Sequence, residues 1–164
     1  MVDATVVIEL LGREVVSIAQ CIAIDADVFP YPSGDFTQRS WRDRTWIARE
    51  PGPGRVIGFL ATRARQGILY LQGLAVDPVA RRGGIGRALL RTCLQSDLAA
   101  NAQAVALSVS VLNRAAIALY ESEGFAVTVR LRDHYPAHAY GAQRDAFAMR
   151  REARWRATTP DLSR

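Results

Sequence analysis

Apolar and polar residues recur along this chain with two different periods, which predict a mixture of strands and helices. Short runs rich in β-branched residues predict strands, because such side chains pack well on a pleated surface. The predicted strands are Thr5–Leu11, Thr45–Arg49, Val56–Arg63, Ile68–Val76, Val105–Val111, Phe125–Leu131 and Asp145–Met149.

Segments with apolar residues one helical turn apart predict amphipathic helices. In the first of them, Ile18, Ile22, Ala26 and Phe29 recur at this spacing, and we expect them to form one buried face. The predicted helices run from Val16 to Phe29, from Ser33 to Trp41, from Ile85 to Ala100 and from Asn113 to Ser122. Strands and helices in this order predict an α/β fold with a mixed sheet.

The composition indicates one folded domain. The chain has 164 residues, of which 49% are hydrophobic and 23% charged, and such values are typical of soluble globular proteins. No apolar run approaches the roughly 18 residues of a membrane span, and we recognise no secretory signal. Two cysteines are too few for a disulfide framework or a four-cysteine zinc site, so we expect no metal and a cytoplasmic location. We expect residues 1–150 to form the domain and residues 151–164 to form a disordered, arginine-rich tail.

The net charge is +5, and every one of the 21 basic residues is arginine. A positive balance suits an anionic partner. Nucleic acid is one such partner, but no binding motif accompanies the charge, so we do not expect it.

The most informative segment is a strand, a glycine-rich loop and a helix within Leu74–Leu90. A helix N-terminus presents unpaired N–H groups and the positive end of a dipole, and glycines let a phosphate approach the backbone. This is not a Walker loop, because no Gly-Lys-Ser/Thr follows. The glycines at 83, 84 and 86 also do not fit the dinucleotide motif G-x-G-x-x-G. The segment therefore predicts a phosphate site of another kind.

In this setting, Arg81-x-x-Gly84-x-Gly86 resembles the pyrophosphate loop of the GNAT N-acetyltransferases. The resemblance implies a mixed, mostly antiparallel central sheet of about seven strands, with about four helices and splayed central parallel strands. It also implies acetyl-CoA as the cosubstrate. The residues that it assigns to acetyl-CoA are Leu74, Ala75, Val76, Arg81, Arg82, Gly83, Gly84, Ile85, Gly86, Arg87, Asn113, Ala116 and Tyr120.

A second segment, residues 107–125, is similar to the strand, asparagine-capped helix and Tyr-x-x-x-Gly-Phe ending of the same family. Asn113, Ala116 and Tyr120 share one face of its predicted helix. In the family, the asparagine contacts the pantetheine arm and the tyrosine hydroxyl protonates the leaving thiolate. Taken alone, the asparagine is an ordinary N-cap and the tyrosine a buried aromatic residue, and both roles are compatible with those functions.

Two further segments resemble the RimI-type branch, which acetylates protein N-termini. Residues 132–136 and 144–149 are similar to its closing hairpin, and Phe29-Pro30 falls where the branch places a Phe-Pro between its first two helices. Both elements flank the peptide groove in that branch. The acceptor-binding residues that the resemblance implies are Phe29, Pro30, Tyr31, Ser108, His134 and Tyr135.

The chain departs from this branch at Ser108, where a glutamate or histidine usually serves as general base. An α-amine has a pKa of about 7.7–8.0, against about 10.4 for lysine, so an N-terminal acceptor depends least on such a base. Tyr70 is a candidate for ordering a water molecule, with an exposed or packed strand tyrosine as the alternative. His134 is a second candidate base.

The sequence leaves three functions open. The first is an N-acetyltransferase that acts on a protein or peptide N-terminus, and the second is one that acts on a small-molecule amine. The third is an acyl-CoA-binding regulatory module without turnover, which the serine at position 108 would suit and Tyr120 would not. Both a monomer and a homodimer are compatible with the sequence.

Overall fold

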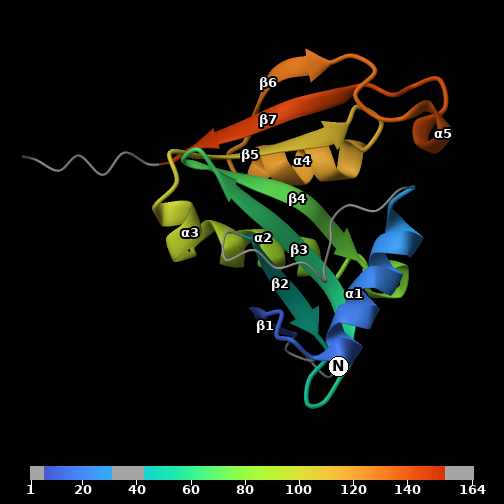
Figure 1. The fold of residues 1–164 in the computed structure, drawn as a ribbon, viewed down its shortest axis with the longest axis vertical. Helices are drawn as coiled ribbons and strands as arrows, with labels where there is room; N and C mark the ends of the chain where they lie inside the picture. Colours follow the sequence, from blue (N-terminus) through green and yellow to red (C-terminus); the bar gives the residue numbers. More distant parts are fainter. Residues whose placement is uncertain (1–5, 31–42, 154–164) are drawn as a thin grey trace, which may run out of the picture.

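Seven strands form one mixed sheet in the computed structural model, which describes residues 6–30 and 43–153 (Figure 1). The strands are β1 (Val7–Leu10), β2 (Asp43–Arg49), β3 (Val56–Arg65), β4 (Ile68–Val76), β5 (Ala104–Ser110), β6 (Ala126–Leu131) and β7 (Ala146–Glu152). Their order across the sheet is β1-β2-β3-β4-β5-β7-β6. Neighbouring strands are antiparallel except β4 and β5, which are parallel. The expected mixed, mostly antiparallel sheet is therefore confirmed.

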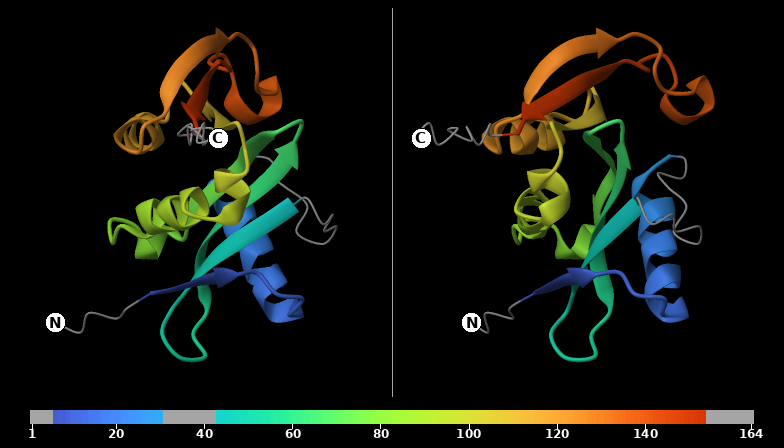
Figure 2. Two further views of the ribbon diagram at one scale, coloured as in Figure 1. Left: turned by 90° about the vertical axis from the view of Figure 1, so that its left-hand side faces the viewer. Right: turned by 60° about the vertical axis from the view of Figure 1, so that its left-hand side comes forward.

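Helices cover both faces of this sheet (Figure 2). They are α1 (Val15–Val28), α2 (Ile85–Leu94), α3 (Asp97–Ala100), α4 (Arg114–Ser122) and α5 (Ala137–Tyr140), with a 3₁₀ turn η1 (Pro78–Ala80). Successive side chains of a strand point to opposite faces. Phe59 accordingly packs in a cluster with α1, whereas Leu60 packs with Leu89 and Leu90 of α2.

The two parallel strands separate after a short contact. β4 and β5 are joined over three residue pairs, from Ile68↔Ala104 to Tyr70↔Ala106. Just beyond, the register of β4 against β3 shifts by one residue, which leaves Gln72 as the extra residue of a β-bulge. A bulge bends its strand and increases the twist. The sheet consequently opens into two halves, β1–β4 and β5-β7-β6 (Figure 1). The splayed central strands that the family resemblance implied are therefore present.

The single helix predicted for residues 85–100 is wrong, because α2 ends at Leu94 and α3 begins at Asp97. Ser96 lies between them, and its hydroxyl accepts a hydrogen bond from the N–H of Ala99 at 3.4 Å. Serine side chains compete with helical hydrogen bonding and are favoured as N-caps. The apolar period continues across the break, which is why the pattern alone does not reveal it.

The predicted first helix is confirmed, but its predicted buried face is only half right, since of the four predicted residues Ile18 and Phe29 alone pack against the core. Ile22 is 45% exposed and Ala26 is exposed, whereas Ser17, Cys21 and Ile24 are buried. This helix is apolar almost all round, so its hydrophobic pattern does not select one face. Small side chains at positions 17 and 21 face the sheet, where they allow a close approach.

The end of the chain also differs from expectation. β7 runs to Glu152, three residues past the predicted strand end at Met149, because Glu152 pairs with Ala104 of β5. The four-residue helix α5 was not expected, since an element so short has no detectable period. Tyr31, the predicted helix Ser33–Trp41 and residues 154–164 lie outside the described residues. Within the described ranges, no helix has the length and apolar character needed to cross a membrane.

The buried face of α1 can be tested with two isoleucines on the same helix. Ile24→Ala should lower the free energy of unfolding by about 2–5 kcal/mol, because it removes a buried side chain that is 7% exposed. Ile22→Ala should change it by no more than about 0.5 kcal/mol, as is usual at exposed positions. Denaturant unfolding of both variants measures the difference, and equal losses would contradict this assignment of the face.

Candidate functional site

A cavity of about 920 Å³ lies where β4 and β5 separate. Its walls include residues of β4 from Tyr70 to Leu74 and of β5 from Ala106 to Ser110. Further walls come from α4, from the end of α1 and from the segment between β6 and β7. Thr128 of β6 and Ala148, Met149 and Arg150 of β7 also line it, so the cavity gathers residues from distant parts of the sequence around the gap in the sheet.

The glycine-rich loop follows β4 and leads into α2. Asp77 caps η1 by accepting a hydrogen bond from the N–H of Val79 at 3.0 Å, and Arg81 Nε donates to the carbonyl of Val76 at 3.1 Å. Arg82 and Gly84 then adopt left-handed backbone angles, with φ of 68° and 74°. In the described part of the chain, the N–H groups of residues 82–87 have no hydrogen-bond acceptor. This arrangement suits an anion at the start of α2.

Gly84 is the residue of this loop that the geometry restricts most. Its positive φ disfavours any side chain with a Cβ, and no heavy atom lies within 4 Å of the place where a Cβ would be. The space beside the loop is thus open rather than filled by the protein. The sequence prediction of a phosphate site is consistent with this geometry.

Arg87 does not offer its guanidinium to this loop. Its Nη1 donates to Glu123 at 2.6 Å and to Ser122 at 3.0 Å, both at the end of α4. Arg91, one turn further along α2, also binds Glu123. The arginine hydrogen bonds lower the pKa of Glu123, whose side chain is only 10% exposed. These contacts, which sequence reasoning missed, tie α2 to α4.

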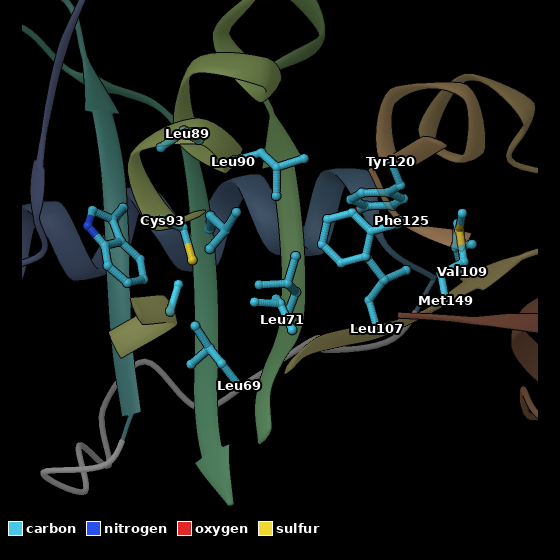
Figure 3. Packing of buried hydrophobic residues seen from close by; sticks show 14 of the residues in the cluster. Leu69, Leu71, Leu89, Leu90, Cys93, Leu107, Val109, Tyr120, Phe125 and Met149 are labelled. Carbon is cyan, nitrogen blue, oxygen red and sulfur yellow. The ribbon is translucent and has the colours of Figure 1, made fainter. Parts of the chain in front are cut away.

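Tyr120 lines the cavity from α4. Asn113 caps this helix by accepting a hydrogen bond from the N–H of Ala116 at 3.1 Å, and both residues also line the cavity. The Tyr120 ring is 7% exposed and lies edge-on to Phe125, with 5.7 Å between ring centroids (Figure 3). Burial raises the pKa of the Tyr120 hydroxyl to about 12. The hydroxyl therefore stays protonated throughout the neutral range.

The opposite side of the cavity is aromatic. Phe29 and Pro30 lie at the end of α1, and His134 and Tyr135 lie on the segment between β6 and β7. Tyr135 is buried, edge-on to His134 at 4.8 Å and stacked on Tyr140 at 4.3 Å between centroids. The structure thus brings together these four predicted acceptor residues, which lie up to about a hundred positions apart in the chain.

Ser108 and Tyr70 also line the cavity, from β5 and β4. Ser108 is exposed and Tyr70 is 37% exposed, so both side chains are accessible. Among the residues predicted to bind acetyl-CoA, Leu74 reaches the cavity, whereas Ala75 is buried beneath α1 and offers only its backbone. The loop residues 81–87 lie outside the cavity lining.

Tyr140 and Arg150 are among the lining residues that sequence reasoning missed. Tyr140 reaches the cavity through α5, and Arg150 reaches it through β7. Arg150 falls in a run of arginines that is typical of a solvated tail, and only the strand pairing reveals its position. The described lining contains no aspartate or glutamate, and the described ranges hold no group of residues suited to a metal ion.

Comparisons with known proteins agree on one family. A sequence model of the acetyltransferase (GNAT) family matches residues 17–125. The ribosomal protein bS18 alanine N-acetyltransferase of Escherichia coli strain K12 is 37% identical over 83 residues. That alignment covers 51% of this chain and 56% of the relative, so only about half the length of the relative is matched. A mycothiol acetyltransferase of Streptomyces avermitilis is 32% identical over 120 residues, which cover 66% of this chain and 39% of that protein.

Solved structures extend the similarity over most of the chain. The crystal structure of the ribosomal-protein-S18-alanine N-acetyltransferase from Escherichia coli superposes with a TM-score of 0.75 and 26% identity, and covers 90% of this chain and 94% of that one. Arabidopsis thaliana NAA60 in complex with a bisubstrate analogue gives a TM-score of 0.73 at 20% identity, over 89% and 98% of the two chains. The second similarity bears on the fold alone.

Proposed function

Because the chain belongs to the acetyltransferase (GNAT) family, we propose that it transfers an acetyl group from acetyl-CoA to the α-amine of a protein or peptide N-terminus. The observation that carries the proposal is the cavity in the sheet, with Tyr120 on one side and an aromatic acceptor groove on the other. We assign the activity to the domain expected at residues 1–150, together with the end of β7, and expect it in the cytoplasm. The Escherichia coli relative, named for acetylating an alanine of a ribosomal protein, supports this choice of acceptor.

The chain's own residues fit acetyl-CoA. The free N–H groups of residues 82–87 would hold its pyrophosphate, and the gap between β4 and β5 would admit the pantetheine arm toward Asn113 and Ala116. The thioester supplies an activated acetyl group. Beyond Tyr70, backbone groups of β4 that face β5 have no strand partner, so an N–H there is available to polarise the thioester carbonyl.

Tyr120 is the proposed general acid. As the amine attacks the carbonyl carbon, the carbon–sulfur bond breaks, and the Tyr120 hydroxyl donates its proton to the leaving sulfur. Burial favours the neutral phenol, which keeps this proton in place until it is needed. Phe125 holds the ring from one side, so that the hydroxyl has a defined position.

The acceptor must lose a proton without a strong base in the described lining. Ser108 occupies the position from which the branch usually supplies one, and no carboxylate replaces it. An N-terminal α-amine is substantially neutral near pH 7.5, whereas a lysine amine is almost wholly protonated. A water molecule ordered by Tyr70 or His134 therefore suffices for an N-terminal acceptor and would serve a lysine poorly.

Replacement of Gly84 tests the phosphate site. Gly84→Val should weaken acetyl-CoA binding by at least about tenfold, because the side chain enters open space beside the N–H groups. Gly52→Val is the matched control, since Gly52 has nearly the same φ of 73° and an equally open environment in the turn between β2 and β3. Calorimetry with the folded variants measures both affinities for acetyl-CoA. An unchanged affinity in Gly84→Val would contradict the assignment of the phosphate site to this loop.

Replacement of Tyr120 tests its proposed role as the general acid. Tyr120→Phe should lower kcat by about 10²–10⁴-fold with nearly unchanged acetyl-CoA affinity, because the ring keeps its packing and only the proton donor is lost. With a pKa near 12, the wild-type phenol loses its proton only well above pH 10, so Tyr120 should cause no fall in kcat between pH 8 and 10. A kcat within about threefold of wild type, with chemistry rate-limiting, would show that the role is wrong.

The acceptor is tested by competition between two peptides. One has a free N-terminus, and the other has the same sequence with a blocked N-terminus and an internal lysine. The free N-terminus should be acetylated at least about tenfold faster, since its amine is far less protonated at neutral pH. Equal or faster acetylation of the blocked peptide would contradict the proposal, and turnover of small amines alone would favour a small-molecule acceptor.

A further inference from the structure

One row of side chains crosses the sheet at the closed end of the cavity. Tyr70 pairs with Ala106 of β5, and Ala106 pairs with Arg150 of β7. Residues directly opposite one another in adjacent strands project on the same face, so Tyr70 and Arg150 flank the small side chain of Ala106. All three line the cavity. Arg150 therefore stands in the acceptor groove rather than in a solvated tail.

Arg150 lies near the place where the acceptor amine would react. Ser108 is two residues along β5 from Ala106, and two residues of a strand span about 7 Å. That distance is comparable to the length of an arginine side chain, and it is about twice the 3.8 Å between the Cα atoms of successive residues, so the two side chains together can span it. A group on the second residue of an acceptor is thus within reach of the Arg150 guanidinium.

The charges around the groove are unbalanced. Arg150 is the single permanently charged side chain of the described lining, and that lining holds no carboxylate. Two carboxylates near the rim already have partners, because Asp133 binds Arg144 and Asp145 binds Arg130. The described groove therefore offers one cation and no anion to a bound peptide.

Arg150 has a partner that it can exchange. Its Nε and Nη2 donate hydrogen bonds to the carboxylate of Glu152, at 2.5 Å and 3.3 Å. The Arg150 side chain is 36% exposed and that of Glu152 is 69% exposed. Exposed ion pairs of this kind are weak and screened by water. A carboxylate held in the groove would form a bidentate pair with the same guanidinium in a less hydrated place.

We propose that Arg150 selects acceptors with an acidic residue at the second position, by pairing with its carboxylate while the N-terminal amine lies beside Ser108. Glu152 occupies the guanidinium when no such acceptor is bound and competes with it. This inference rests on the proposed function and specifies the substrate class of the same site.

The test compares three peptides that differ only at the second residue, which is Asp, Asn or Lys. For the wild type, kcat/KM should be about tenfold higher with Asp than with Asn, and lowest with Lys. Arg150→Gln should bring the Asp-to-Asn ratio close to one, and Arg150→Lys should restore part of it because the charge is retained. Glu152→Gln should raise the ratio above the wild-type value, since the competing carboxylate is gone.

Arg151→Gln is the matched control for these variants. Arg151 is the next residue of β7 and points to the other face, where its Nε lies 3.4 Å from the position of a Cβ on Gly124. This variant should keep the wild-type Asp-to-Asn ratio. A wild-type Asp-to-Asn ratio of one or less, or an undiminished ratio in Arg150→Gln, overturns the proposal that Arg150 selects the second residue. Either result leaves the proposed N-terminal acetyltransferase activity intact. Failure of the wild type to acetylate any of the three peptides overturns the proposed function instead.

Discussion

The brevity of the contact between β4 and β5 is the constraint on which the rest of the site depends. Three residue pairs hold these strands together, and the bulge at Gln72 then turns β4 away. A sheet that stayed paired would have satisfied its backbone and left no room between the strands. The early separation leaves backbone groups unpaired and opens a passage between the two faces of the sheet. Tyr120 on one side and the aromatic residues on the other therefore line the same cavity.

Local signals made most of the fold predictable. β4 was predicted with its observed limits because Asp77-Pro78 ends it, and Asn113 and Gly124 marked the ends of α4. The buried face of α1 was predicted only in part, because this helix is apolar almost all round and its hydrophobic pattern selects no single face. The insertion of β7 between β5 and β6 was equally hidden, since strand order depends on contacts between distant segments.

The candidate site was predictable where a residue type has a geometric reason, and not where only its position matters. Gly84 was predicted because a phosphate can approach the backbone closely only where glycines precede the helix, and the structure adds its positive φ. Arg150 and Glu123 were missed because each is an ordinary charged residue in the sequence. Their importance comes from neighbours on other elements, Ala106 in one case and Arg87 in the other, and no local pattern encodes those neighbours.

The link between α2 and α4 has a consequence for how the molecule moves. α2 packs on the half-sheet β1–β4, whereas α4 connects β5 to β6 in the other half. The two halves are thus joined by the short β4–β5 ladder and also by Glu123, which accepts hydrogen bonds from two arginines of α2. Rotation of one half against the other about the ladder would have to break these hydrogen bonds. The link between α2 and α4 therefore favours a gap that is already open before any ligand arrives, which reduces the conformational entropy lost on binding.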